Sequence, residues 1–504
     1  MGTKKLIEVA LPLEAINKES AREKSIRHGH PSTLHLWWSR KPTATARAVI
    51  WASLVDDPSS HPEQFHTEEA QTAERERLFH ILEKLVVWEN SNNPEVLDAA
   101  KAEIMKSTGG NPPALLDPFA GGGSIPLEAQ RLGLEAHAHD LNPVAVMINK
   151  AMIEIPPKFA GQPPVHPDAS ALEGGWSGAA GLAEDVRYYG EWMKQEAFQR
   201  IGHLYPKVKD ESGKEHTAIA WIWARTVRCP NPACECEIPL TSSFILSKKK
   251  GRESWVKPTY TDGKLHFHVY NGPYDPKLEN GTRKGKKALF CCPFCGDGIV
   301  NGDYADKEAS AGKIGVSLMA VVAECDSGRI YISPDEATTL DLLKKIDAFY
   351  RKNSIEDTVS HAECRGTFAS NAQGRHYGFF EFCDYFTQRQ LIALSTLTAS
   401  ITRVMEKIVA DGGTKEYAGA VGVYLSFVVD KLSDYHSSIC SWHNSGEKMR
   451  NTFGVQGIPM TWNYAEGNLF SSSSGSFDNM LDWVYKCIVD FPVSKAGEAH
   501  QFDA

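Results

Sequence analysis

The sequence predicts an α/β protein in which a parallel sheet carries an inserted β-rich domain and additional helices. Residues 114–149 have the pattern strand, glycine turn, helix, strand, acid. Two pairs of closely spaced cysteines lie on either side of a strand-rich stretch within residues 221–300. Helical spacing of apolar residues recurs over 387–407 and 415–435, which predicts two long amphipathic helices outside the sheet.

The first of these stretches reads ALLDPFAGGGSIPLEAQRLGLEAHAHDLNPVAVMINK. Residues 114–116 are apolar and end at Asp117, which is typical of a buried parallel strand. Three glycines follow, then helical spacing over 124–132 and a second strand over 135–139 that ends at Asp140. Glycines allow a ligand to approach the backbone, and an acid after the second strand can accept hydrogen bonds from ribose hydroxyls. The stretch therefore predicts a nucleoside-binding unit.

The residues around the turn favour S-adenosylmethionine over a dinucleotide. A dinucleotide fingerprint needs a third glycine where this chain has Pro126. Asp117 would repel a pyrophosphate, whereas it suits a ligand with an ammonium and a sulfonium group. An NAD-type enzyme, or a glycine-rich turn of some other α/β domain, is the alternative. The residues predicted to bind the cofactor are Asp117, Phe119, Ala120, Gly121, Gly122, Gly123, Asp140 and Asn142.

Length and composition set the broad class of the protein. A chain of 504 residues is too long for one ordinary core, and its 42% apolar content is that of a globular protein. We expect four regions: a cofactor-binding core over 1–155, a linker and helices over 156–220, a zinc ribbon over 221–300 and a mixed α/β region over 301–504. A net charge of −9 argues against a uniformly basic coat for nucleic acid.

The chain has eleven cysteines at uneven spacings, which is typical of a reducing compartment. It shows no signal peptide and no apolar run long enough to cross a bilayer. These features predict a cytoplasmic protein without membrane contact. Short strands are expected in 313–333 and 355–385, and a polar tail is expected after a last helix over 477–489. The other expected helices share an apolar face and cover residues 43–54, 69–88 and 183–202.

Two cysteine knuckles predict a structural zinc site. Cys229 and Cys234 form a C-x4-C pair, and Cys292 and Cys295 form a C-x2-C pair. Two such pairs supply the four thiolates of a tetrahedral zinc centre. Cys236 and Cys291 compete with their neighbours as ligands, so Cys234/Cys236 is an alternative first pair, and Cys291 is an alternative to Cys292 in the second. Iron would satisfy the same four-sulfur pattern.

The stretch between the knuckles is basic and aromatic. Residues 248–287 contain 11 Lys and Arg against 4 Asp and Glu, in a chain that is acidic overall. Cations with interleaved aromatic side chains favour phosphate contact and base stacking. The alternative is a solvated hairpin. The interleaved aromatic and imidazole side chains are Trp255, Tyr260, His266, Phe267, His268, Tyr270 and Tyr274.

A loop before the predicted helix at 43–54 is dense in rings and cations. It includes His35, Trp37, Trp38, Arg40 and Lys41. The tryptophans fit an internal packing role, and the loop as a whole also fits contact with the cofactor or with DNA.

The sequence resembles a bacterial and archaeal family of adenine-specific DNA methylases. The resemblance is carried by the N-terminal loop described above and by the motifs DPFAGGGS and DLNPVA. Members of this family have an N-terminal domain of unknown function and a zinc ribbon inside the methylase. The resemblance covers the chain and is strongest at 22–50, 115–149, 225–240 and 454–470. It implies a Rossmann-like, seven-stranded, S-adenosylmethionine-dependent methyltransferase sheet, with DNA as the substrate and a flipped target base.

The catalytic motif of that family is missing from this sequence. Amino-methyltransferases use Asp, Asn or Ser followed by Pro-Pro and an aromatic residue, which accept hydrogen bonds from the target amine and stack on the flipped base. Residues 111–114 read Asn-Pro-Pro-Ala, where alanine cannot stack, and are better read as the lead-in to the first strand. In the family an Asp-Pro-Pro-Tyr motif lies downstream of the region equivalent to this chain, so no catalytic residue is assigned here.

The sequence thus predicts a DNA adenine-N6 methyltransferase of a restriction-modification or phage-defence system, or its cofactor- and DNA-binding portion, with zinc and S-adenosylmethionine as cofactors. A partner chain could carry the catalytic motif. Cytosine-N4 methylation and an RNA substrate fit the same residues. A non-catalytic DNA-binding or assembly subunit that keeps the methyltransferase scaffold is the alternative.

Overall fold

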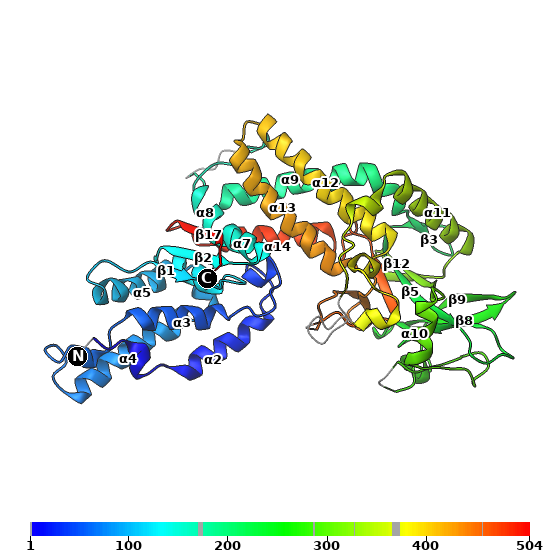
Figure 1. Cartoon of the computed structure of the whole chain (residues 1–504), viewed down its shortest axis with the longest axis horizontal. Helices are drawn as coiled ribbons and strands as arrows, with labels where there is room; N and C mark the ends of the chain where they lie inside the picture. Colours follow the sequence, from blue (N-terminus) through cyan, green and yellow to red (C-terminus); the bar gives the residue numbers. More distant parts are fainter. Residues whose placement is uncertain are drawn as a thin grey trace. The chain divides into compact units, whose positions relative to one another are not determined.

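The computed structural model describes residues 3–169, 175–285, 288–326, 328–364, 373–455 and 457–503. The chain forms two compact units, each assembled from separate segments (Figure 1). Unit 1 contains residues 1–190, 402–427 and 481–504, and unit 2 contains residues 191–401 and 428–480. Four helices contribute residues to both units, and they are α9 (Ala180–Ile201), α12 (Gln388–Ala410), α13 (Lys415–Tyr435) and α14 (Phe477–Asp490).

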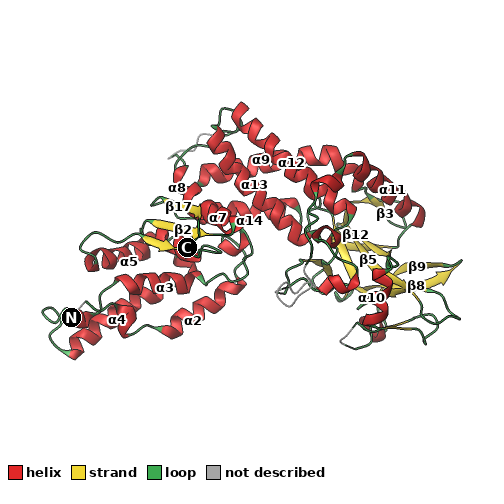
Figure 2. Ribbon diagram, viewed as in Figure 1, coloured by secondary structure: helices red, strands yellow, loops and turns green. Residues whose placement is uncertain are grey.

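Unit 1 is mainly helical and has one small sheet (Figure 2). Helix α3 begins where the sequence predicts, because Pro42 precedes it and the buried Glu23 carboxylate accepts hydrogen bonds from the Thr43 and Ala44 N–H groups at 2.8 and 2.7 Å. The helices that lie within this unit are α1 (Leu6–Val9), α2 (Leu13–Arg22), α3 (Thr43–Leu54), α4 (Glu68–Leu85), α5 (Pro94–Ser107), α6 (Ser124–Arg131), α7 (Pro143–Asn149) and α8 (Ile155–Lys158).

The sheet of unit 1 is parallel and has three described strands in the order β1-β2-β17. Strand β1 (Leu115–Asp117) pairs with β2 (Ala136–Asp140), with Leu115 opposite Ala136. Strand β17 (Gly497–Gln501) pairs with the other side of β2, and Gly497 is also opposite Ala136. The predicted strand, glycine turn, helix and second strand are therefore confirmed, whereas the expected polar tail contains a third strand of the same sheet.

Unit 2 is built around an antiparallel sheet in the order β13-β12-β5-β16, with β6 also paired to β5. A second sheet, β7-β8-β9, contains the basic hairpin. The strands of the first sheet are β5 (Ala218–Arg228), β6 (Glu237–Leu240), β12 (Gly315–Cys325), β13 (Gly328–Ile332) and β16 (Asn463–Gly467). The second sheet contains β7 (Ile245–Ser247), β8 (Ser254–Thr261) and β9 (Lys264–Asn271).

Short hairpins and two helices complete unit 2. The hairpins are β3 (Val208–Lys209) with β4 (Glu215–His216), β10 (Phe290–Cys291) with β11 (Ile299–Val300), and β14 (Ser441–His443) with β15 (Lys448–Arg450). The helices are α10 (Gly302–Ser310) and α11 (Glu336–Lys352). The strands expected in 313–333 are present, but the described part of 355–385 forms 3-10 turns, so the strand prediction there is wrong; residues 365–372 lie outside the described chain.

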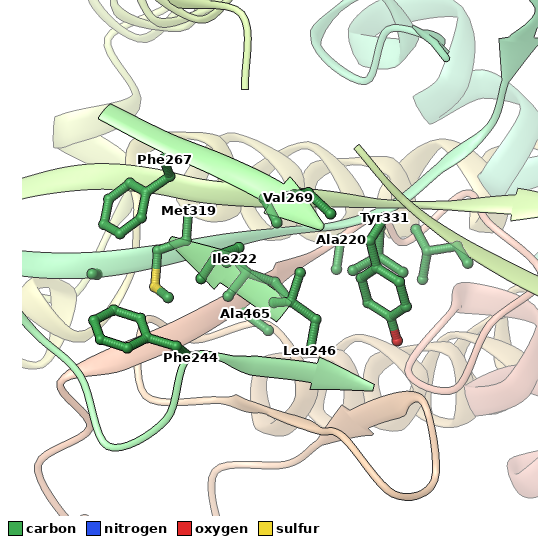
Figure 3. Close-up of a cluster of buried hydrophobic side chains, with 14 of the residues drawn as sticks. Ala220, Ile222, Phe244, Leu246, Phe267, Val269, Met319, Tyr331 and Ala465 are labelled. Carbon is green, nitrogen blue, oxygen red and sulfur yellow. The ribbon is translucent and has the colours of Figure 1, made fainter. Parts of the chain in front are cut away.

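The main core of unit 2 lies between its two larger sheets. Figure 3 shows Ile222 of β5, Met319 of β12 and Ala465 of β16 against Phe267 and Val269 of the basic hairpin. All five side chains are buried. Alternate residues of the hairpin are thus anchored in a core, so the hairpin is not the wholly solvated element that was the alternative interpretation.

Within the described chain, no helix has both the length and the apolar composition that crossing a bilayer requires.

Candidate cofactor turn and metal centre

The glycine turn lies at the carboxyl ends of β1 and β2, between the two predicted acids. The Gly121 N–H donates a 2.9 Å hydrogen bond to Asp140 Oδ2, and the Asn142 N–H donates to Asp140 Oδ1 at the same distance. Asp117 Oδ1 accepts a 3.1 Å hydrogen bond from the Phe119 N–H. The acid that ends β2 therefore holds the turn that follows β1, as the spacing of the two acids requires.

The N-terminal loop covers one side of this turn. Gly121 has a φ of +50°, and a β-carbon there would lie 2.9 Å from Trp37 Nε1. A β-carbon on Gly122 would lie 3.2 Å from Arg40 Cζ, and the Arg40 guanidinium donates a hydrogen bond to the Gly122 carbonyl. Glycine is thus needed because protein side chains approach the backbone, and the loop predicted to have either a packing or a cofactor role touches the turn directly.

The other side of the turn exposes predicted cofactor residues. Phe119 is 77% exposed and Asn142 is also exposed, and Leu141, a neighbour that was not predicted, is 66% exposed. Asp117 and Asp140 are partly buried behind them. Ala120 is buried, and its N–H donates a 2.9 Å hydrogen bond to the His139 carbonyl, so it contributes to the structure of the turn.

Electrostatics at the turn favour a cation. Burial raises the pKa of Asp117, the Phe119 N–H partly offsets this increase, and the nearby Asp140 charge raises the pKa further. A positive group placed beside the Asp117 carboxylate would favour its ionised form. The geometry is therefore suited to a ligand that carries positive charge.

Sequence spacing could not reveal two buried polar atoms next to the turn. Arg40 Nε and Asn149 Oδ1 have no hydrogen-bond partner in the described part of the chain. Asn149 lies at the end of α7, and its Oδ1 would be 2.6 Å from a β-carbon on Gly123. Buried polar groups are normally paired, so these atoms mark a place where a polar ligand or water would supply partners.

The four predicted cysteines come together in unit 2. The ligand atoms of Cys229, Cys234, Cys292 and Cys295 all lie within 4.8 Å of one another. Two of the Sγ–Sγ distances, Cys229–Cys295 and Cys234–Cys292, are 3.8 Å. Tetrahedral zinc with Zn–S bonds of about 2.3 Å requires sulfur separations of about 3.8 Å. The cluster therefore suggests a zinc site.

Two hairpins position the thiolates. The first pair follows β5, where the Cys229 N–H donates to the Cys236 carbonyl at 2.8 Å. The second pair follows β10, where the Cys292 N–H donates to the Gly298 carbonyl at 2.7 Å. A β-carbon on Gly298 would lie 2.2 Å from Cys229 Sγ, so only glycine fits between the two knuckles.

The remaining thiols of this region lie outside the cluster. The Cys291 thiol donates a hydrogen bond to the Gly296 carbonyl at 3.0 Å. Burial and the interaction with the neighbouring Cys234 raise the pKa of the Cys236 thiol to about 11. Within the cluster, the Gly298 N–H donates to Cys295 Sγ at 3.3 Å and backbone N–H groups lower the pKa of Cys295 to about 6, whereas burial raises the pKa of Cys229 and of Cys292. A thiolate at neutral pH is the form that binds metal.

The basic hairpin separates its side chains between two faces. Val256, Leu265, Phe267 and Val269 are buried in the core. On the opposite face Trp255 stacks on Tyr270 with ring centroids 4.6 Å apart. The cross-strand partners on that outer face are Trp255 with Tyr270, Lys257 with His268, and Thr259 with His266. Lys286 and Lys287 of the predicted basic stretch lie outside the described residues.

Comparison with protein-family models gives one match, a family described as "Protein of unknown function (DUF1156)", over residues 10–81. The matched segment includes α2, α3 and the loop that touches the glycine turn. Searches of curated proteins and of solved structures give no match.

Proposed function

We propose that the chain is an S-adenosylmethionine-dependent DNA adenine-N6 methyltransferase of a restriction-modification or phage-defence system, or the cofactor- and DNA-binding portion of one. The observation that carries the proposal is the glycine turn held by Asp140 at the carboxyl ends of two neighbouring parallel strands. Ligands of open α/β sheets bind at that edge. Under this proposal the sheet is the beginning of a Rossmann-like methyltransferase fold.

Four of the predicted residues would contact the cofactor directly. Asp140 would accept hydrogen bonds from the ribose, and Asp117 would bind the cationic amino-acid end directly or through water. Phe119 and Asn142 are exposed beside these acids and would line the open side. When bound, S-adenosylmethionine would supply an electrophilic methyl group, while the protein would hold it and position the target amine.

The β1 edge offers a place for the missing catalytic strand. Among the described strands, β1 pairs only with β2. Leu116 on β1 is 56% exposed and Phe119 is 77% exposed, although strands of parallel sheets are normally covered on both faces. A strand with an apolar flank, donated by a partner chain or by further sequence, would pair with β1 and bring a Pro-Pro-aromatic motif to the cofactor turn.

Unit 2 would bind the nucleic acid. The four-cysteine cluster adjoins the end of β5, and the outer face of the β8–β9 hairpin presents Lys257 and His268 beside the Trp255–Tyr270 stack. Cations bind phosphates and exposed aromatic rings stack on bases. Duplex DNA with a flipped base is the proposed substrate.

The second candidate function is a non-catalytic DNA-binding or assembly subunit. It is favoured by the absence of a Pro-Pro-aromatic motif from the sequence, where residues 111–114 read Asn-Pro-Pro-Ala. The cofactor turn would then act as a scaffold or a sensor.

Calorimetry with S-adenosylmethionine, followed by labelled cofactor and duplex DNA in the same sample, tests both functions. Binding without methyl transfer is expected if the catalytic strand comes from elsewhere. Binding with transfer would show that this chain contains its own catalytic residues, and Asn111 would be the first residue to mutate. No binding would favour the scaffold function.

A further inference from the structure

A second set of metal-ligating side chains lies in unit 2, in the stretch where strands were expected. His361, Glu381 and Cys383 place their ligand atoms within 4.8 Å of one another. None of these residues belongs to the four-cysteine cluster, and the proposed function uses none of them. Sequence spacing provides no signal for the group because His361 is far from the other two residues along the chain.

Backbone pairing brings the three residues together. The Cys364 N–H donates to the Phe380 carbonyl at 2.7 Å, and the Phe382 N–H donates to the Ala362 carbonyl at 3.1 Å. The segment that contains His361 and the segment that contains Glu381 are therefore tied side by side. Cys364 is fully buried next to Tyr385, which is 3% exposed, in a small apolar cluster that anchors both segments. The three side chains project from a braced framework, as a preorganised site requires.

Two of the three separations between the ligand atoms fit one ion, and the third is short. His361 Nδ1 is 2.7 Å from Glu381 Oε2 and 3.8 Å from Cys383 Sγ, and Cys383 Sγ is 3.5 Å from Glu381 Oε2. A tetrahedral zinc ion with ordinary bond lengths requires separations of about 3.3–3.6 Å between nitrogen, oxygen and sulfur ligands. The carboxylate, at 42% exposure of its side chain, needs to move by only about half an ångström.

The orientation of the imidazole is fixed from its other side. His361 Nε2 lies 3.1 Å from the Glu356 carbonyl, which can only accept, so Nε2 carries a hydrogen. Between Nδ1 and the Glu381 carboxylate there must be either a proton, which makes the ring an imidazolium paired with Glu381, or a metal ion. The Cys383 thiol donates to the same carboxylate oxygen at 3.5 Å, and a metal ion that replaced both protons would contact all three ligand atoms at once, which a single proton cannot do. Metal-bound histidines commonly donate their second N–H to a backbone carbonyl in this way.

We propose that His361 Nδ1, Glu381 Oε2 and Cys383 Sγ bind a second zinc ion, separate from the four-cysteine centre. The mixed nitrogen, oxygen and sulfur donors suit a late first-row divalent metal. Metal binding displaces the Cys383 thiol proton and any proton on Nδ1 into solvent. Three protein ligands leave the fourth tetrahedral position to water or to an incoming anionic ligand, which distinguishes this open site from the closed four-sulfur centre.

Zinc content of the purified full-length chain, after incubation with micromolar Zn²⁺ and desalting, tests the proposal. We expect two zinc ions per chain in the wild type and one in the His361→Ala/Cys383→Ser double variant. Cys325→Ser is the matched control, because Cys325 is a half-buried thiol outside both clusters, and this variant should keep two. One zinc per wild-type chain, or two in the double variant, would overturn the proposal.

Cobalt substitution gives a readout that does not depend on the double variant folding. Glu381→Gln keeps the size of the side chain and removes one anionic ligand, so its second equivalent of Co²⁺ should bind at least tenfold more weakly than in the wild type. Cys383→Ser should lose the part of the thiolate-to-cobalt absorption that the second equivalent produces. Identical titrations of wild type and both variants would contradict the assignment. Neither outcome depends on S-adenosylmethionine or DNA binding, so the metal site and the proposed function can fail separately.

Discussion

Arg47 Nε of α3 lies 2.5 Å from Glu128 Oε2 of α6, and both side chains are buried to 1% exposure or less. Arg131 Nε lies 3.2 Å from the same oxygen. One carboxylate thus joins the segment that matches the family model to the helix that follows the glycine turn. The N-terminal segment is part of the framework of the turn rather than an appendage.

Removing that carboxylate should destabilise unit 1. Glu128→Gln removes the carboxylate paired with the buried Arg47 and leaves Arg131 with only the more distant Asp490 charge, and breaking a buried ion pair typically costs about 3–5 kcal/mol. The midpoint of urea unfolding should therefore fall well below that of the wild type. Glu135→Gln is the control, because the Glu135 side chain is 64% exposed and should change stability by under about 0.5 kcal/mol. Equal midpoints for the two variants would mean that the buried pair contributes nothing.

The contact between Trp37 and Gly121 predicts that the N-terminal loop affects cofactor affinity. Trp37→Ala removes the ring against which the turn packs, so the turn is less ordered before binding. If the turn binds S-adenosylmethionine as proposed, we expect the Trp37→Ala variant to bind it about tenfold more weakly, which corresponds to about 1.4 kcal/mol. Trp38→Ala, at a 59% exposed neighbour, should bind like the wild type. Calorimetry on both variants decides, and the loop has no such role if both retain full affinity.

Under the proposed function, binding of S-adenosylmethionine should weaken in mild acid because the pKa of Asp117 is raised by burial and by the Asp140 charge. A cation binds the ionised carboxylate, and this form is lost as the pH falls through the raised pKa. The loss should therefore begin at a higher pH than for an ordinary aspartate, whose pKa is about 3.9. In calorimetric titrations across this pH range, Asp117→Asn should bind more weakly and lose this pH dependence. If that variant shows the same pH profile as the wild type, Asp117 does not bind the cationic end of the cofactor.

Loss of the second cysteine knuckle should unfold the metal-bound part of unit 2. Cys292→Ser with Cys295→Ser removes two ligands and exposes a core that includes Phe290 and Trp462. In such small modules the free energy of metal binding contributes to the free energy of folding. The far-ultraviolet circular dichroism signal and the zinc content should therefore fall together. Cys291→Ser, a change outside the cluster, should keep the four-cysteine zinc. Retention of that zinc in the double variant would refute the ligand assignment.

Local signals explain why part of this structure was predictable. Proline before Thr43 and glycines after Asp117 determine backbone conformation within a few residues, and the predicted bounds of α3, β1, α6 and β2 agree with the structure to within one residue. The four cysteines were predictable because a tight pair at a turn has few other uses.

Other features depend on partners far away in the sequence. Strand β17 is polar and short, and only its pairing with β2 makes it a strand. The 3-10 turns near residue 382 replaced an expected strand because Asp384 accepts hydrogen bonds from the Phe380 and Glu381 N–H groups. Neither the contact of Trp37 with the turn nor the approach of His361 to Cys383 leaves any periodic trace in the sequence.

The outer face of the basic hairpin supports a final prediction about nucleic acid. Lys257 and His268 are exposed cross-strand partners beside the Trp255–Tyr270 stack. If Lys257 neutralises a phosphate, Lys257→Ala should weaken duplex binding and reduce the slope of log affinity against log salt by about 0.9, because one fewer counterion is released. Tyr270→Ala should lower affinity with little change in that slope, since stacking is not ionic.

Fluorescence anisotropy measures both slopes with a labelled duplex between 50 and 200 mM salt. Over this range the affinity is expected to change about 10³-fold for a protein that makes several phosphate contacts. Lys345→Ala on α11 is the matched charge control, because Lys345 is already paired with Asp341 at 2.7 Å. If Lys257→Ala and Lys345→Ala give the same slope of log affinity against log salt, Lys257 on the hairpin does not contact the phosphates. The nucleic-acid contact would then have to be sought on another surface, while the zinc centre and the cofactor turn would be unaffected by that result.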